Sequence, residues 1–224
     1  MTALLLWNCT DYADDWVNKY GPIYDDSVTG HYDCGVCNCV STEYLNQDML
    51  AAGKYGELLD VRDNQVYRTI QIGNKVWTAQ NMNYEIEGSF CLYNSVYNCS
   101  RFGRLYTWNA AMMACPEGWS LPSGEDFTNL FGVSGDSYGS MLAKGIDEWS
   151  FATDEFGFSA LPAGAYYDGN FFTGKNEYGP REVNFWSSST YVVDFYGYFY
   201  GVIDYTSEFV RGEKSGASVR CVKD

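Results

Sequence analysis

The single histidine of the chain lies beside three cysteines in the stretch HYDCGVCNC. His31, Cys34, Cys37 and Cys39 could bind zinc, because three thiolates and one imidazole are an ordinary zinc ligand set. The gap between Cys37 and Cys39 is tight for such a site, and no second Cys-x-x-Cys half follows. The alternatives are a redox-active pair, or two disulfides shared among these three cysteines and Cys9. Disulfides are favoured because Cys9 also needs a partner, but four cysteines permit three pairings and the spacing does not choose among them.

Nucleophilic catalysis has weak support in this sequence. A Ser–His or Cys–His arrangement would have to use His31, the only histidine in the chain. The stretch FWSSST supplies Ser187 to Ser189, but no base accompanies these hydroxyls. We therefore expect no enzyme of this class.

Neighbouring carboxylates could perform acid–base chemistry of the kind that cleaves glycosides. Two pairs occur, Asp147 with Glu148 and Asp154 with Glu155. In a chain with 29 acidic residues, such pairs are usually solvated surface. A structural calcium ion remains a minority alternative.

An aromatic run near the end of the chain, YVVDFYGYFYGVIDY, alternates with the two-residue period of a β-strand. We expect Phe195, Phe199 and Ile203 to face the interior and the tyrosines to face solvent. Tyrosine interspersed with Gly, Ser and Asp is the composition of many binding surfaces, although core or subunit packing is the alternative. With the stretch AYYDGNFF, the run gives these candidate ligand-binding residues: Tyr166, Tyr167, Asp168, Tyr191, Asp194, Tyr196, Tyr198, Tyr200, Asp204, Tyr205, Glu208 and Arg211.

Composition limits the class of protein. The 224 residues are enough for one domain with an extension, and we place the boundary between residues 1–56 and 57–224. The formal net charge of −15 argues against nucleic-acid binding and against an anionic membrane surface. No stretch reaches the length of a membrane span, so we expect no direct membrane insertion. Eight cysteines, an even number, favour an oxidising compartment.

The elements expected to carry these residues form an α+β arrangement. Residues 42–55 have helical periodicity, and residues 66–77 read as a β-hairpin that turns at Gly73 and Asn74. Two helices follow, over residues 104–115 and from a capping box at Ser123 to about Gly132. Beyond Gly135 we expect small antiparallel sheets with long irregular loops, the last strand pairing with the first.

Several blocks occur in an order and spacing that identify a family. They are DVRDNQVYRTIQIGNKVWTAQNMNYE, GSFCLYNSVYNCSRFGRLYTWNAAMMACPEGWSLPS, DEFGFSALPAG, FWSSS and SVRCV. Together they closely resemble the Fibrobacter succinogenes major paralogous domain over residues 57–224. The resemblance implies a C-type-lectin-like fold, distantly similar to the formylglycine-generating enzymes and to retroelement-diversified variable proteins. It also implies two disulfides, Cys91–Cys99 and Cys115–Cys221, and an exported or surface-attached bacterial domain.

No reaction or ligand comes with this resemblance. The triplets through which C-type lectins bind calcium and sugar are absent, so that mode of binding is not expected. We expect a secreted or cell-surface binding module without cofactor or catalysis, whose partner is a protein or a carbohydrate. Its export signal would lie outside this sequence. The rival interpretations are a structural domain of a surface assembly, for which the oligomeric state is open, and an enzyme related to the formylglycine-generating group.

Overall fold

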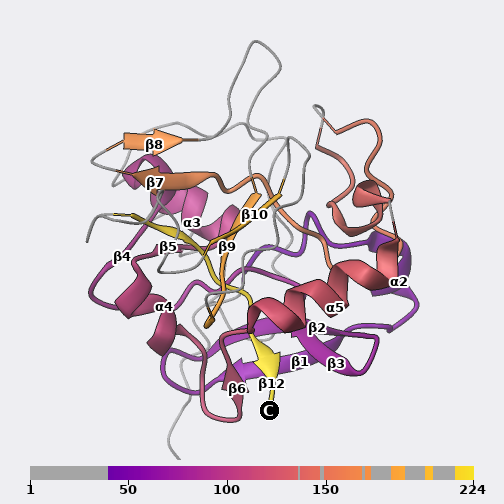
Figure 1. The fold of residues 1–224 in the computed structure, drawn as a ribbon, viewed down its shortest axis with the longest axis horizontal. Coiled ribbons are helices and arrows are strands. Elements are labelled where there is room, and N and C mark those ends of the chain that lie inside the picture. Colours follow the sequence, from indigo (N-terminus) through magenta and orange to yellow (C-terminus); the bar gives the residue numbers. More distant parts are fainter. Residues whose placement is uncertain are drawn as a thin grey trace, which may run out of the picture.

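The computed structural model describes residues 40–135, 137–146, 149–167, 170–172, 183–189, 200–203 and 215–224 (Figure 1). These residues form two five-stranded sheets, a two-stranded hairpin and several short helices. The protein is therefore α+β, as the sequence predicts, and its sheets are curled. The cysteines and histidine expected to bind zinc or form disulfides near the N-terminus, His31 among them, lie outside the described residues.

The first sheet contains the predicted hairpin and the end of the chain. Its strand order is β1-β2-β3-β12-β6, and its pairings are antiparallel. The last strand, β12, pairs with β3 and β6, so the expectation that it would pair with the first strand is wrong. The strands are β1 (Gly56–Asp60), β2 (Gln65–Ile72), β3 (Lys75–Thr78), β6 (Trp119–Ser120) and β12 (Val222–Lys223).

The second sheet is mixed, which corrects the expectation of antiparallel sheets throughout. Its order is β10-β9-β11-β5-β4, and β9 pairs in parallel with both β10 and β11. Parallel neighbours need crossover connections, which leave no turn signal in the sequence. The strands are β4 (Ser89–Phe90), β5 (Leu105–Tyr106), β9 (Val183–Trp186), β10 (Tyr200–Ile203) and β11 (Ala217–Ser218), with β7 (Ala165–Tyr167) and β8 (Asn170–Phe172) forming a separate hairpin.

Four α-helices occur in the described part of the chain: α2, α4 and α5 lie within or overlap the three expected helical segments, and α3, which begins inside the loop between Cys91 and Cys99, was not expected. The longest is α5, whose predicted capping box is confirmed: Ser123 Oγ accepts a hydrogen bond from Asp126 N at 3.1 Å, and the Asp126 carboxylate accepts from Ser123 N at 2.9 Å. The helices are α2 (Gln47–Ala51), α3 (Val96–Phe102), α4 (Trp108–Ala114) and α5 (Gly124–Ser134), with 3₁₀ turns η2 (Leu92–Asn94) and η3 (Tyr138–Met141).

The core between α5 and the sheets is built from aromatic rings. The Trp77 ring lies 5.3 Å from Phe127 and 5.7 Å from Phe158, measured between centroids. Phe185 of β9 stacks on Phe127 at 5.8 Å, so the second sheet contributes to the same cluster. One continuous apolar core therefore joins α5 with both sheets.

Arg220 is fully buried within this core, next to the last strand. Its guanidinium donates to the carbonyls of Thr78, Phe158 and Ser159 at 2.7–2.9 Å. Its Nε donates to Asn81 Oδ1 at 2.6 Å, and its Cζ lies 4.6 Å from the centre of the Phe158 ring. The arginine of the SVRCV block therefore has a structural role: its hydrogen bonds connect β3 with the loop before β7.

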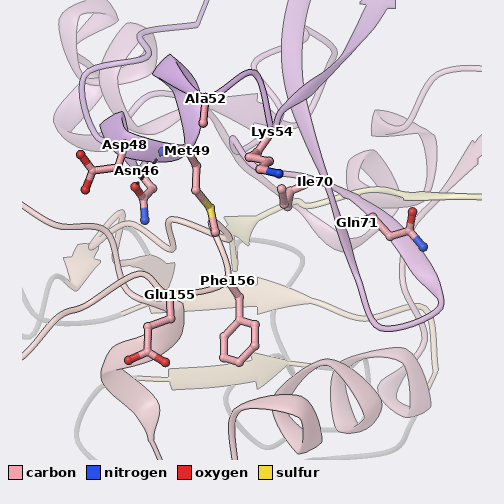
Figure 2. A pocket seen from close by; sticks show the side chains of 9 residues that line it. All are labelled: Asn46, Asp48, Met49, Ala52, Lys54, Ile70, Gln71, Glu155 and Phe156. Atoms are coloured by element: carbon pink, nitrogen blue, oxygen red, sulfur yellow. Dashed lines mark hydrogen bonds between the residues drawn. The ribbon is translucent and has the colours of Figure 1, made fainter.

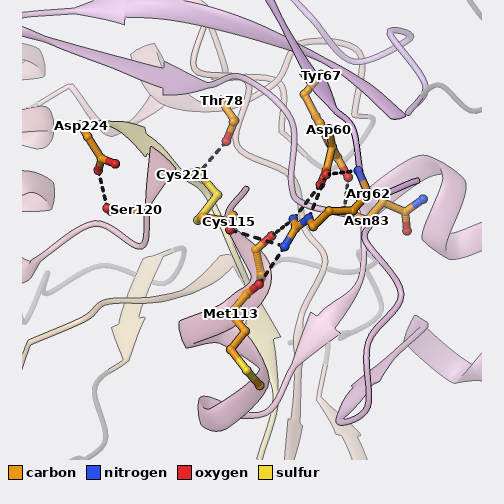
Figure 3. Close-up of a disulfide and its surroundings, with 11 residues drawn as sticks. Asp60, Arg62, Tyr67, Thr78, Asn83, Met113, Cys115, Ser120, Cys221 and Asp224 are labelled. Atoms are coloured by element: carbon orange, nitrogen blue, oxygen red, sulfur yellow. Dashed lines mark hydrogen bonds and ion pairs between the residues drawn. A yellow bond between two sulfur atoms is a disulfide. The ribbon is translucent and has the colours of Figure 1, made fainter. Parts of the chain in front are cut away.

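Both disulfides implied by the family resemblance are present. Cys91 bonds to Cys99 across η2 and α3, and Cys115 bonds to Cys221 next to the last strand. Figure 3 shows Arg62 beside the second disulfide, where it donates to the carbonyls of Met113 and Ala114 at the end of α4. Arg62 also pairs with the buried carboxylate of Asp60, its Nη2 lying 2.6 Å from Oδ2.

The segment before β1 packs into the same core as the rest of the domain. Val40, Leu45 and Tyr55 are buried, and the Gln80 side chain donates to the carbonyls of Val40 and Ser41 at 3.0 and 2.8 Å. The boundary placed after residue 56 stays a prediction, but the described residues ahead of it contribute buried side chains to the domain.

Candidate functional site

Of the residues expected to bind a ligand, Tyr166 and Tyr167 have described side chains. Both are half-buried on β7, where Tyr166 pairs with Phe171 and Tyr167 with Asn170 of β8. The main chain of Tyr166 also exchanges two hydrogen bonds with Gly216, at 2.8 and 2.7 Å. The β7–β8 hairpin is therefore fastened to the second sheet.

Four rings gather where this hairpin meets β4 and the disulfide loop. We call Phe90, Tyr93, Tyr166 and Phe171 the aromatic cluster. Phe90 and Tyr166 meet at 4.6 Å, Tyr166 and Phe171 at 5.0 Å, and Tyr93 and Phe171 at 5.3 Å between ring centroids. Tilted and edge-to-face pairs of this kind each contribute about 0.5–1.5 kcal/mol beyond the area that they bury. The cluster is therefore a rigid assembly contributed by separate segments of the chain.

Phe90 anchors the cluster to the second sheet. A Cβ atom placed on Gly216 would lie 2.3 Å from Phe90 Cζ, so the ring rests directly on the glycine backbone. Any larger residue at position 216 would displace the ring. Gly216, just before β11, thus leaves room for the Phe90 ring and also pairs with Tyr166 through its main chain.

Tyr93 is the exposed end of the aromatic cluster, with 54% of its surface accessible. Its backbone is left-handed, with φ of 55° and ψ of 24°, and Asn94 also has a φ of 55°. Left-handed conformations at residues other than glycine cost about 1–3 kcal/mol and persist only where the surroundings enforce them. Such strain concentrates at functional positions, and here it presents an aromatic ring to solvent.

The disulfide loop enforces that conformation. Cys91–Cys99 closes the loop, Asn94 N donates to the carbonyl of Cys91 at 2.8 Å, and Asn98 Nδ2 donates to the carbonyl of Leu92 at 2.9 Å. The sequence predicts a disulfide loop at CLYNSVYNC but does not single out Tyr93. The available signal was a pair of tyrosines within a short loop closed by two cysteines.

Most of the sequence-predicted site has no described geometry. Tyr200 begins β10, paired with Val183 of β9, and nothing is described of its side chain. The expected inward and outward faces of the tyrosine run remain predictions. The residues outside the described part of the chain are Asp168, Tyr191, Asp194, Tyr196, Tyr198, Asp204, Tyr205, Glu208 and Arg211.

The serines of the FWSSS block have structural partners. Ser187 Oγ donates to the carbonyl of Ser189 at 2.9 Å, and Ser189 Oγ accepts from Gly124 N at 3.0 Å. This second bond satisfies an amide in the first turn of α5, where backbone donors lack partners within the helix. These contacts join β9 to α5.

The carboxylates of Asp154 and Glu155 face different surroundings. Asp154 is fully buried and accepts from Ser159 N at 2.8 Å and from Ser159 Oγ at 2.7 Å, whereas Glu155 is exposed. Burial raises the pKa of the Asp154 carboxyl to about 7, although the hydrogen bonds from Ser159 and the charge of Arg220 oppose the shift. The other pair, Asp147 and Glu148, lies outside the described residues.

Within the described ranges, no group of three or more His, Cys, Asp or Glu side chains is arranged to hold a metal ion. The same part of the chain contains no helix of the length and apolarity needed to cross a membrane.

Comparison with known proteins gives one match. The family model of the Fibrobacter succinogenes major domain matches residues 54–223. No curated protein and no solved structure matches the chain.

Proposed function

The chain belongs to the Fibrobacter succinogenes major domain family, and we propose that it is an extracellular or cell-surface binding module with a tyrosine-rich ligand surface. The ligand is a protein or a carbohydrate. The surface includes the aromatic cluster, Tyr167 and the tyrosine run of residues 191–205.

One observation carries this proposal: the exposed ring of Tyr93 stands on a strained backbone at the edge of a rigid aromatic cluster. A ring of this size is usually buried in a folded domain, whereas 54% of the Tyr93 surface is accessible. An exposed tyrosine supplies apolar area and a hydroxyl with few rotatable bonds, so little entropy is lost when a ligand orders it. The predicted binding residues Tyr166 and Tyr167 lie on β7, which pairs with β8, and Phe171 of β8 contacts the Tyr93 ring.

The proposed location and fold have separate support. Two disulfides close the described domain, and disulfides persist in oxidising compartments such as the cell exterior. The proposed C-type-lectin-like fold is supported by the Cys115–Cys221 bond, which joins the end of α4 to the last strand, and by the pairing of that strand with β3. The absence of catalysis is part of the proposal and is supported by the structural hydrogen bonds of Ser187 and Ser189.

The experiment is a glycan and protein array probed with the wild-type chain and two variants. The first variant is Tyr93→Ala, and the second replaces Tyr196, Tyr198 and Tyr200 by Ala. We expect each to lose at least tenfold in binding to the ligands that the wild type retains, with urea denaturation showing that both fold. The exposed residue Met112, on α4, provides the control Met112→Ala. If neither tyrosine variant changed binding to any ligand, the proposal would be wrong. A stable oligomer in place of ligand binding would favour the structural interpretation.

A further inference from the structure

A hollow lies between α2, β2 and the turn that contains Glu155. Its volume is about 500 Å³ and it is open to solvent. Met49, Ile70 and Phe156 form an apolar floor that is continuous with the main core (Figure 2). We call this hollow the α2 groove.

The walls of the α2 groove are fixed to each other. Asn46 Nδ2 donates to the carbonyl of Asp154 at 2.7 Å, and the Tyr55 hydroxyl donates to the carbonyl of Gly157 at 3.1 Å. A Cβ atom on Gly157 would lie 2.7 Å from Met49 Sδ, so helix and turn are in close contact beneath the groove. A ligand would therefore enter a preformed site and would not have to order its walls.

The rim of the groove is polarised. In Figure 2 the carboxylates of Asp48 and Glu155 lie on one side of Met49, and Lys54 and Gln71 lie on the other. All four of these residues are exposed. A complementary ligand would carry a positive charge, then an apolar group, then a hydrogen-bond acceptor or a negative charge.

We propose that the α2 groove binds a peptide segment of a partner protein, with an apolar side chain on the floor and a Lys or Arg beside Asp48 and Glu155. Small-molecule sites usually enclose most of their ligand, which this open groove does not. A peptide can lie along it, seat one side chain and continue into solvent. The formal net charge of −15 further favours a basic segment over an acidic one.

The α2 groove is separate from the described part of the proposed ligand surface. In Figure 1, α2 lies on the opposite side of the molecule from β7 and β8. The Tyr93→Ala variant should therefore leave peptide binding unchanged, so failure of one proposal does not imply failure of the other.

The test uses the whole chain and a library of labelled, capped pentapeptides. In each peptide the central residue is Leu, Met or Phe, and the flanking residues vary among Lys, Glu and Ser. We expect enrichment of peptides with Lys on one side and Glu or Ser on the other. The double variant Asp48→Asn with Glu155→Gln should weaken their binding about tenfold, and the charge reversal Asp48→Lys with Glu155→Lys should invert the preference.

Two further variants test whether a change in affinity comes from the charge and shape of the groove and not from unfolding of the protein. Glu87→Gln with Glu117→Gln removes the same charge from exposed positions outside the groove and should leave affinity unchanged. Ala52→Trp adds bulk at an exposed lining residue without removing a core side chain, and should abolish binding. The proposal is overturned if no peptide is enriched, or if binding is equal in wild type, Ala52→Trp and the Asp48/Glu155 variant. It is also overturned if these variants instead change the mass of the protein in solution, since the groove would then be an interface between copies.

Discussion

The side-chain amide of Asn46 donates to the main-chain carbonyl of Asp154 at 2.7 Å, across 108 residues of sequence. The same side chain accepts from Met49 N at 3.2 Å and so caps α2. One asparagine thus begins the helix and attaches it to the turn at residues 154–157. The position of α2, and with it the groove, depends on this residue.

Replacement of Asn46 should separate these two roles. Asn46→Ser retains a cap but cannot reach Asp154, so the free energy of unfolding should fall by about 1–2 kcal/mol because a buried carbonyl loses its donor. Asn46→Ala loses the cap as well and should cost about 1 kcal/mol more. Urea denaturation measures both, with Glu87→Ala as an exposed control. Equal stability of Asn46→Ser and wild type would show that the bond to Asp154 contributes nothing.

Asp154 should make stability depend on pH. Its pKa is raised to about 7 in the folded protein, against about 3.9 in an unfolded chain. Between about pH 4 and pH 7 the folded protein retains a proton that the unfolded chain has released. The contribution of this group is therefore fully present below about pH 4, falls as the pH rises, and is lost above about pH 7.

The matched variant is Asp154→Asn, which is neutral at every pH and tolerates the φ of 47° found at this position. Relative to wild type, the free energy of unfolding of Asp154→Asn should rise from pH 4.5 to pH 7 and then level off. Glu155→Gln controls for the loss of one neighbouring carboxylate. Parallel curves for Asp154→Asn and wild type, measured by urea denaturation across this range, would contradict the prediction.

The elements that could be predicted from the sequence are those determined locally. The capping box at Ser123 and the turn at Gly73 depend on residues only a few positions apart, and both are confirmed. The helix expected over residues 42–55 is shorter, because Asn46 begins it and Gly53, with a φ of 63°, follows its last turn. The disulfides required the family resemblance, since spacing alone does not pair cysteines.

Long-range pairing accounts for much of what the sequence did not reveal. Leu105 and Tyr106 have helical periodicity with the residues that follow, yet they pair with β4 and β11 and form a strand. Tyr93 was missed for a related reason: its exposure depends on a left-handed backbone that the loop imposes, and no periodicity encodes that conformation. Tertiary contacts override local propensity at both places.

Arg62 connects a buried acid to a helix end and a disulfide. Its guanidinium pairs with Asp60, which has no exposed surface, and donates to two carbonyls at the end of α4. Arg62→Ala should lower the free energy of unfolding by about 1–3 kcal/mol, because the buried Asp60 carboxylate loses its hydrogen-bond donors. The double variant Arg62→Ala with Asp60→Asn should recover part of that loss. Equal stability of the single and double variants in urea would show that the unpaired Asp60 carboxylate is not the cause.

The two disulfides should contribute unequally. Cys115–Cys221 spans 106 residues and Cys91–Cys99 spans 8. In the chain-entropy account, bonds with these separations stabilise by about 4.7 and about 2.5 kcal/mol, respectively. Replacing each pair by alanines should therefore destabilise the protein more at positions 115 and 221. Comparison of the two double variants by urea denaturation tests the order, and a larger loss at positions 91 and 99 would contradict it.

Tyr93 allows backbone strain and ligand binding to be separated. Tyr93→Gly and Tyr93→Ala both remove the ring and its contact with Phe171, but glycine adopts a φ of 55° without a steric penalty. The glycine variant should therefore be about 1 kcal/mol more stable than the alanine variant. Both should lose ligand binding on the array, and Tyr93→Phe should retain most of it because stacking depends on the ring. If Tyr93→Gly bound ligand as strongly as the wild type, the left-handed conformation would be needed only for the structure of the loop, and the Tyr93 ring would have no role in binding. If Tyr93→Gly is more stable than the wild type and binds no ligand, then tyrosine at this position lowers stability and is needed for its exposed ring.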